Sequence, residues 1–166
     1  ELPANINIRF IMISYEKVRR SLKSWNSFIA WINTLGTVFK VYLIASYFFL
    51  LNNLAEIKKM YSASQYQAIL ASTHISVLVL TIIGLVANIT IAYLAFRNRS
   101  HIVDSEPDLS PYLIGIIYTV GYNILSLIVT LFVLGGSFVP TSVIVPLLFL
   151  ALYIYVYRKA QTLLDK

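Results

Sequence analysis

The longest uncharged stretch of the chain runs from Leu109 to Tyr157 and contains no Asp, Glu, Lys, Arg or His. A helix that crosses a bilayer needs roughly 20 apolar residues, so a stretch of about 49 residues is long enough for two crossings and a turn. Gly135, Gly136 and Ser137, followed by Pro140, supply turn-forming residues near its middle. We therefore expect a helical hairpin that resides in a membrane.

The composition extends this expectation to the whole chain. Of the 166 residues, 58% are hydrophobic and only 12% are charged, and the mean hydropathy is +0.76. Soluble domains carry about 25% charged residues. We predict an all-α fold: a single integral membrane domain over residues 1–166, built as a four-helix bundle in the lipid bilayer.

Four apolar runs define the expected spans, at about residues 32–51, 75–96, 111–134 and 141–157. A polar loop is expected between the first two spans, and a second loop at Ser100–Asp108. Ser110 is expected to cap the third span, with Pro111 in its first helical position. Pro146 is expected to bend the fourth span, because a proline inside a helix removes one backbone hydrogen bond.

The N-terminal region precedes these spans. Ile6, Ile8 and Phe10 alternate as in a strand, but a lone strand beside a membrane has nothing to pair with, so we expect residues 1–10 to be irregular. Residues 11–29 place apolar side chains at helical spacing with basic residues on the other face. Three interpretations remain open: a basic amphipathic helix in the membrane interface, an extension of span 1 packed on its neighbours, or a coiled-coil seam. The interfacial interpretation makes candidate lipid-headgroup contacts of Lys17, Arg19, Arg20 and Lys23.

The basic residues predict the orientation. With the N-terminus inside, two of them, Lys58 and Lys59, fall outside, and ten fall inside: Arg9, Lys17, Arg19, Arg20, Lys23, Arg97, Arg99, Arg158, Lys159 and Lys166. Positive residues favour the cytoplasmic side. We expect a multi-pass protein of the plasma or inner membrane with both termini in the cytoplasm.

Lys40 is the one charged residue inside a predicted span. It lies about 12 Å past the start of span 1 at 1.5 Å per residue, so its amine either reaches back to the interface or contacts an anion, a substrate or a partner's carboxylate. Asn88, Tyr122 and Asn123 are polar residues at membrane depth. They hydrogen-bond across packed helices, line a polar cavity with Lys40, or form part of a contact between subunits of an oligomer.

The chain lacks the residues that several kinds of catalytic and metal-binding site require. The chain has no cysteine, and it contains no zinc-protease, phosphate-loop or nucleophile-elbow motif, so we expect no enzyme, no cofactor and no metal site. The second loop contains His101, Asp104, Glu106 and Asp108. These residues lack the spacing of a calcium-binding loop, and we expect the loop to be solvated. Nucleic acid binding is not expected, because the basic residues lie beside spans. Glu1 is not a start methionine, so we expect a processed chain or one that lacks its beginning.

Three functional hypotheses follow. The first is a non-enzymatic accessory or interaction protein that binds a membrane partner or neutralises a toxin, since packing residues are plentiful and no span holds a carboxylate. The second is a homo-oligomeric transporter or channel whose path Lys40, Asn88 and Asn123 line. The third is a lipid-sensing protein that uses the basic segment 11–29. Small multidrug transporters resemble the chain in span number, but they depend on a glutamate in the first span, where this chain has Lys40.

Overall fold

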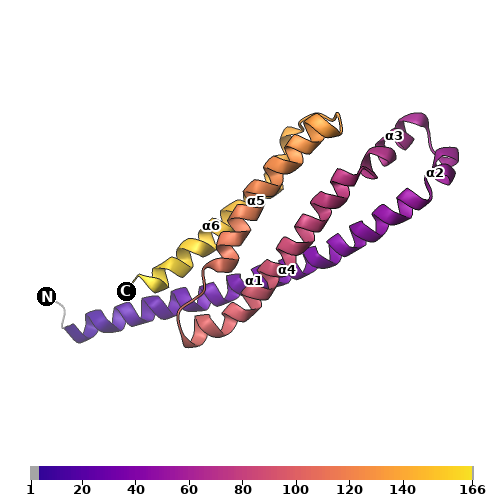
Figure 1. Cartoon of the computed structure of the whole chain (residues 1–166). Helices are drawn as coiled ribbons and strands as arrows, with labels where there is room; N and C mark the ends of the chain where they lie inside the picture. Colours follow the sequence, from indigo (N-terminus) through magenta and orange to yellow (C-terminus); the bar gives the residue numbers. More distant parts are fainter. Residues whose placement is uncertain (1–3, 166) are drawn as a thin grey trace.

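The structure is a computed structural model that describes residues 4–165. Within this range the chain is helical, with α1 at Ala4–Asn52, α2 at Leu54–Met60, α3 at Ala63–Ser72, α4 at Ile75–Asp104, α5 at Ser110–Ile128 and α6 at Ile144–Leu164 (Figure 1). In this described part, four helical segments are long and apolar enough to cross a membrane: Ala4–Asn52, Ile75–Asp104, Ser110–Val133 and Pro140–Leu164. The expected helical class and the number of candidate spans are therefore confirmed.

The four long helices pair as two antiparallel hairpins. One is formed by α1 and α4, which α2 and α3 connect, and the other by α5 and α6. Figure 1 shows the hairpins meeting near the two termini and diverging toward α3 and the α5–α6 turn. The most buried apolar side chains lie where the hairpins meet: Leu22, Ile29, Ala30, Ile91, Ala95, Ile102, Tyr112, Tyr153, Val156, Ala160 and Leu163.

The N-terminal region differs from the expectation. Residues 1–3 lie outside the described residues, but α1 begins at Ala4, so the prediction of an irregular segment over residues 1–10 is wrong from that point on. No break separates residues 11–29 from the first span. Leu22 and Ile29 are fully buried in the core, which matches the packed extension among the three interpretations. Tyr15 and Val18 on the same apolar face pack against this core, whereas Ile11 and Trp25 are exposed.

The first connection contains more structure than a polar loop. Ser62 and Gln65 form a reciprocal capping box at the start of α3, with the Gln65 N–H donating to Ser62 Oγ at 3.4 Å and the Ser62 N–H donating to Gln65 Oε1 at 3.1 Å. His74 then caps α4, because its Nδ1 accepts the Ser76 N–H at 3.1 Å. The Ser62–Gln65 box thus starts α3 and His74 starts α4, in a connection where only polarity was considered.

The hydrogen bonds at the start of α5 differ from the predicted Ser110 cap. Ser110 donates rather than accepts: its N–H and its hydroxyl both bond to Asp108 Oδ1, at 2.9 and 2.7 Å. The Asp108 carboxylate thus satisfies a backbone donor at the start of α5. The loop before it is also shorter than predicted, since α4 continues to Asp104.

The α5–α6 turn is at the predicted position. Gly135 has a φ of +67°, a left-handed conformation that glycine adopts without steric cost, and its neighbour's N–H bonds back to the Thr130 carbonyl at 2.8 Å. A π-helical segment at Val129–Val133 ends the α5 rod, and a 3₁₀ turn at Pro140–Val143 starts the return. Pro146 falls in the first turn of α6, where its missing N–H breaks no helical bond, so the reason for the expected bend is absent.

Candidate functional site

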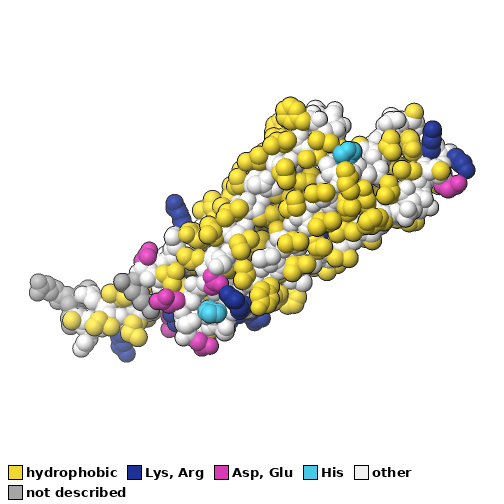
Figure 2. Space-filling view, viewed as in Figure 1, with side chains coloured by type: hydrophobic (Ala, Val, Ile, Leu, Met, Phe, Trp, Pro, Cys, Tyr) yellow, Lys and Arg dark blue, Asp and Glu magenta, His cyan; other side chains and the backbone are white. Residues whose placement is uncertain are grey.

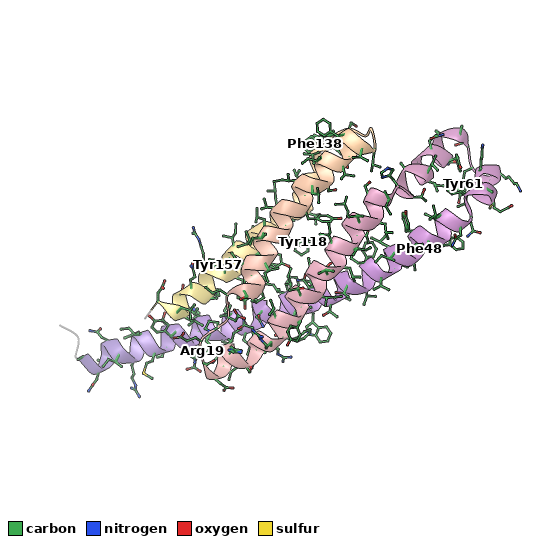
Figure 3. All side chains as sticks on the ribbon, in the orientation of Figure 1. Arg19, Phe48, Tyr61, Tyr118, Phe138 and Tyr157 are labelled. Atoms are coloured by element: carbon green, nitrogen blue, oxygen red, sulfur yellow. The ribbon has the colours of Figure 1, made fainter. Side chains whose placement is uncertain are left out.

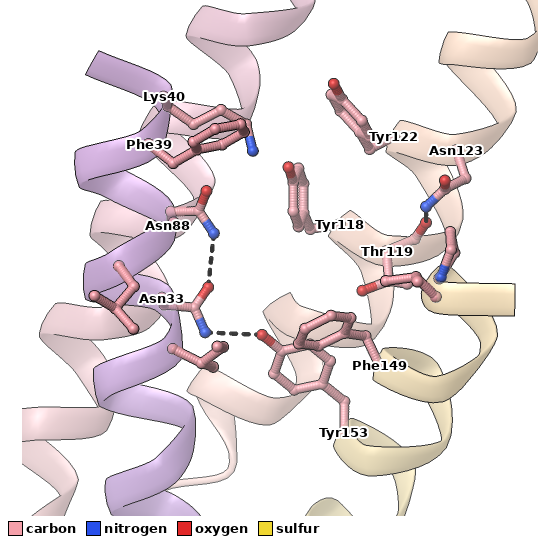
Figure 4. Close-up of a pocket in the computed structure, with 15 residues that line it drawn as sticks. Asn33, Phe39, Lys40, Asn88, Tyr118, Thr119, Tyr122, Asn123, Phe149 and Tyr153 are labelled. Carbon is pink, nitrogen blue, oxygen red and sulfur yellow. Dashed lines mark hydrogen bonds between the residues drawn. The ribbon is translucent and has the colours of Figure 1, made fainter. Parts of the chain in front are cut away.

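A pocket of about 470 Å³ lies between the two hairpins (Figure 4). All four helices contribute to its wall, and Figure 3 shows Tyr118 in the space between the hairpins. The pocket brings together the four polar residues that the sequence singled out, Lys40, Asn88, Tyr122 and Asn123. The remaining wall is mainly apolar and aromatic: Ile32, Asn33, Leu35, Gly36, Phe39, Tyr118, Thr119, Val145, Pro146, Phe149 and Tyr153.

A chain of amide hydrogen bonds closes the pocket on the side of the core. The Asn88 amide donates to Asn33 Oδ1 at 2.8 Å, and the Asn33 amide donates to the Tyr153 hydroxyl at 2.9 Å and to the Ile29 carbonyl at 2.9 Å. This chain links α4, α1 and α6. Asn88 Oδ1 is buried and has no donor among the described residues; it faces Gly36, where an added Cβ would lie 3.1 Å away. Asn33 and Asn88 are therefore oriented by one another and by Gly36.

Lys40 extends across the gap between α1 and α4. A Cβ added at Gly84 would lie 2.6 Å from Lys40 Cε, 3.4 Å from Lys40 Nζ and 3.0 Å from the Tyr118 hydroxyl, so the absence of a side chain at Gly84 makes room for both groups. Figure 4 shows the ammonium directed into the pocket. Within residues 4–165, Lys40 makes no ion pair.

The depth of Lys40 follows from its neighbour on α4. At 1.5 Å per residue, Gly84 lies about 20 Å from Arg97 and about 15 Å from His74, which is close to the middle of the apolar part of α4. A lysine at the centre of a transmembrane helix costs about 2.5–3.5 kcal/mol on insertion scales.

Sequence reasoning missed several residues of the site, notably Asn33, Tyr118 and Tyr153. One signal was available. Asn26, Asn33 and Lys40 are seven residues apart, which places them on one stripe of α1. The two tyrosines had no such signal, because an isolated tyrosine in an apolar helix looks the same whether it faces lipid or a cavity.

A second polar cluster lies in the core below the pocket. The Tyr112 hydroxyl donates to Asn26 Oδ1 at 2.7 Å and accepts from Asn98 at 2.9 Å, and the Asn26 amide donates to the Ala95 carbonyl at 2.8 Å. Asn98 also accepts the Asp108 N–H at 2.7 Å. Asn26, Asn98 and Tyr112 are fully buried with these bonds made, so the cluster ties α1, α4 and α5 together and leaves no group free for a ligand.

Asp108 lies at the edge of this cluster, outside the apolar segments. Burial tends to raise the pKa of its carboxyl, but the hydrogen bonds from Ser110 and the Arg97 guanidinium outweigh burial and hold the pKa below the usual value. Arg97 donates to Asp108 Oδ2 at 3.3 Å. The other acidic residues of this loop, Asp104 and Glu106, are exposed. In the described part of the chain, no group of three or more His, Cys, Asp or Glu residues could hold a metal ion.

The four candidate headgroup contacts lie away from the pocket, on the part of α1 near the N-terminus. Lys17, Arg20 and Lys23 are exposed, and Arg20 pairs with Glu16 at 3.7 Å. Arg19 is half-buried, and its Nε is enclosed with no partner among residues 4–165. These side chains are too far along α1 to take part in the pocket.

The pocket therefore offers one cation, amides and phenol hydroxyls within an apolar and aromatic wall, and its lining includes no carboxylate. Such a wall can bind an anionic or hydrogen-bonding group that is attached to an apolar body. Comparisons of the chain with protein-family models, with curated proteins and with solved structures gave no match.

Proposed function

We propose that the chain is a multi-pass membrane protein in which four helices cross the bilayer as a bundle, with both termini in the cytoplasm. The length and hydropathy of the four segments support this, and Figure 2 shows charged side chains at the two ends of a hydrophobic middle. The end near the termini carries most of the basic residues, as the positive-inside bias favours. On this orientation Lys17, Arg19, Arg20 and Lys23 contact lipid headgroups.

We propose further that it acts as a non-enzymatic interaction protein that holds another membrane component between its hairpins. The observation that carries this proposal is the pocket of about 470 Å³ in which Lys40 makes no ion pair with any of residues 4–165. An occupant that supplies a polar partner would remove part of the cost of an isolated cation. The pocket volume lies in the range of about 300–1,000 Å³ that is typical of specific binding sites.

Photocrosslinking in native membranes tests this proposal. A benzophenone amino acid replaces Phe39 or Phe149, which line the pocket, and Phe49 in the matched control. Phe39 and Phe49 lie on the same helix, and their side chains are 56% and 65% exposed, so a probe at either position is accessible to a neighbouring molecule. Only Phe39 borders the pocket. We expect a discrete adduct from Phe39 and Phe149 that Phe49 does not give. Identical adduct patterns at all three positions, or none at either pocket position, would contradict the proposal.

A second candidate function is transport of a small solute by a homo-oligomer. A neighbouring pocket of about 320 Å³ shares one lining residue, Asn123, with the first one and is otherwise lined by residues near the α5–α6 turn, so transport would require the two pockets to join. On the opposite side the Asn33–Tyr153 bond and the packed core close the path, which favours binding over transport.

Flux in proteoliposomes separates the two functions. Transport predicts that the parent protein carries small anions such as chloride or acetate and that Lys40→Ala abolishes the flux. Lys58→Ala, which removes an exposed charge, is the control and leaves flux unchanged. Flux that survives Lys40→Ala, or no flux in the parent, removes the transport candidate.

A further inference from the structure

We propose that the pocket accepts an Asp or Glu side chain from a transmembrane helix of a partner protein, that this residue lies near the middle of the bilayer, and that its carboxyl pairs with Lys40. The inference rests on the proposed function and names the chemistry of the partner. It is drawn from the isolation of the lysine, from its depth and from the exposed rim around it.

The first step concerns charge. The acidic residues of the chain are Glu1, Glu16, Glu56, Asp104, Glu106, Asp108 and Asp165, and none lies in the apolar part of a candidate span. Lys40 therefore has no acidic residue of its own chain at its level. A carboxyl that balances its charge must come from another molecule.

The second step concerns depth. The level of Lys40 and Gly84 is about 20 Å from Arg97 and about 15 Å from His74 along α4. The hydrocarbon core is about 30 Å thick, so a lipid phosphate in the headgroup layer is about 15 Å or more from this level. A side chain on a spanning helix can lie at any depth. The geometry therefore favours a partner helix over a phospholipid headgroup.

The third step concerns the rim of the pocket. Leu35 and Phe39 on α1 and Val145 on α6 are 63%, 56% and 58% exposed, and they flank the pocket from the two diverging hairpins. A spanning helix packs its face on such a rim while one of its side chains enters the pocket. Membrane helices associate through this combination of close packing and polar contacts.

A host–guest experiment tests the inference with a defined probe. The full chain is reconstituted in phosphatidylcholine vesicles with a synthetic helix of Leu and Ala that carries a single central Glu, and association is measured by energy transfer. Three other probes are measured in parallel: the same helix with a central Gln, the same helix with its Glu near one end, and oleate as a free carboxylate. The dye is attached to Thr162→Cys, which is exposed and provides a single thiol because the chain has no cysteine.

We expect the central-Glu helix to bind about tenfold more tightly than the central-Gln helix, which corresponds to the usual strength of one polar contact in a membrane. Lys40→Met should abolish this preference and Lys58→Met should retain it. Lys40→Gln is the second variant, and circular dichroism with monodisperse elution in detergent checks that both Lys40 variants fold.

Two results would overturn the inference. One is equal binding of the Glu and Gln helices, or a preference that survives in both Lys40 variants. The other is Lys40-dependent binding of oleate without binding of the helix, which would assign the pocket to a small amphiphilic acid. In either case a pocket-specific photoadduct would still support the proposed interaction function, so the two proposals fail separately.

Discussion

The ring of Tyr153 on α6 lies against the backbone of Gly115 on α5, in a space that a side chain on Gly115 would fill. The same ring carries the hydroxyl that accepts from Asn33 at 2.9 Å and closes the pocket toward the core. One glycine thus determines both how closely α5 and α6 approach and where the pocket ends.

Gly115→Ala should destabilise the protein by about 1–3 kcal/mol, because the added methyl group meets the body of an aromatic ring that cannot move without breaking its contacts. Gly121→Ala is the matched control on the same helix, since no atom lies within 4 Å of its added Cβ. That control should be neutral or stabilise by up to about 1 kcal/mol through helix propensity. Unfolding in mixed detergent micelles measures both, and equal effects would contradict the packing described for Gly115.

Asn98→Ala should cost about 2 kcal/mol or more. The substitution leaves the Asp108 N–H and one side of the Tyr112 hydroxyl without partners in the core. Asn123→Ala is the comparison, because Asn123 is half-buried and its amide donates to a single carbonyl of its own helix, Thr119, at 2.6 Å. Its effect should stay within about 0.5 kcal/mol. A loss for Asn98→Ala as small as the one for Asn123→Ala would show that the buried cluster does not hold α4 and α5 together.

Asp108 should make stability depend on pH in the acidic range. Its pKa is lower in the folded than in the unfolded chain, so its contribution is fully present above the ordinary aspartate value and is lost as the pH falls below about 4 and through the folded pKa. Asp108→Asn should reduce the change in the free energy of unfolding over this pH range. Asp104→Asn, at an exposed position where α4 ends, should leave it unchanged. A wild-type slope that persists in Asp108→Asn would assign the pH dependence to other groups.

The proposed orientation predicts opposite labelling of the two ends. The absence of native cysteine permits single substitutions at the exposed residues Gln67 on α3 and Thr162 on α6. A membrane-impermeant thiol reagent applied to intact cells should label Gln67→Cys and should label Thr162→Cys only after permeabilisation. Labelling of Thr162→Cys in intact cells would reverse the orientation.

The number of long apolar helices and the turn at Gly135 could be predicted because each depends on a local property, namely hydropathy over a span and the backbone freedom of glycine. The length of α1 could not. Its apolar period over residues 11–29 fits a membrane surface and a protein surface equally well, and only packing on α4 and α6 distinguishes them.

Among the residues of the pocket, too, some features can be predicted from local sequence and others depend on how the helices pack. Polar residues are rare inside the predicted spans, so four of them stand out in the sequence. They line one pocket: Lys40, Asn88, Tyr122 and Asn123. The proximity of Gly84 to Lys40 and Tyr118, in contrast, depends on the register of α1 against α4. Asp108 was assigned to a solvated loop, and its bond to Ser110 depends on a turn whose geometry the residues alone do not specify.

The unbroken helix α1 has a mechanical consequence. Its 49 residues extend about 74 Å, more than twice the thickness of a hydrocarbon core. Proline is absent from its length, and its N-terminal arm projects beyond the remainder of the fold (Figure 1). Because this arm and the pocket residues Asn33 and Lys40 belong to one uninterrupted helix, we expect a partner bound to the arm to change the tilt of the segment that lines the pocket.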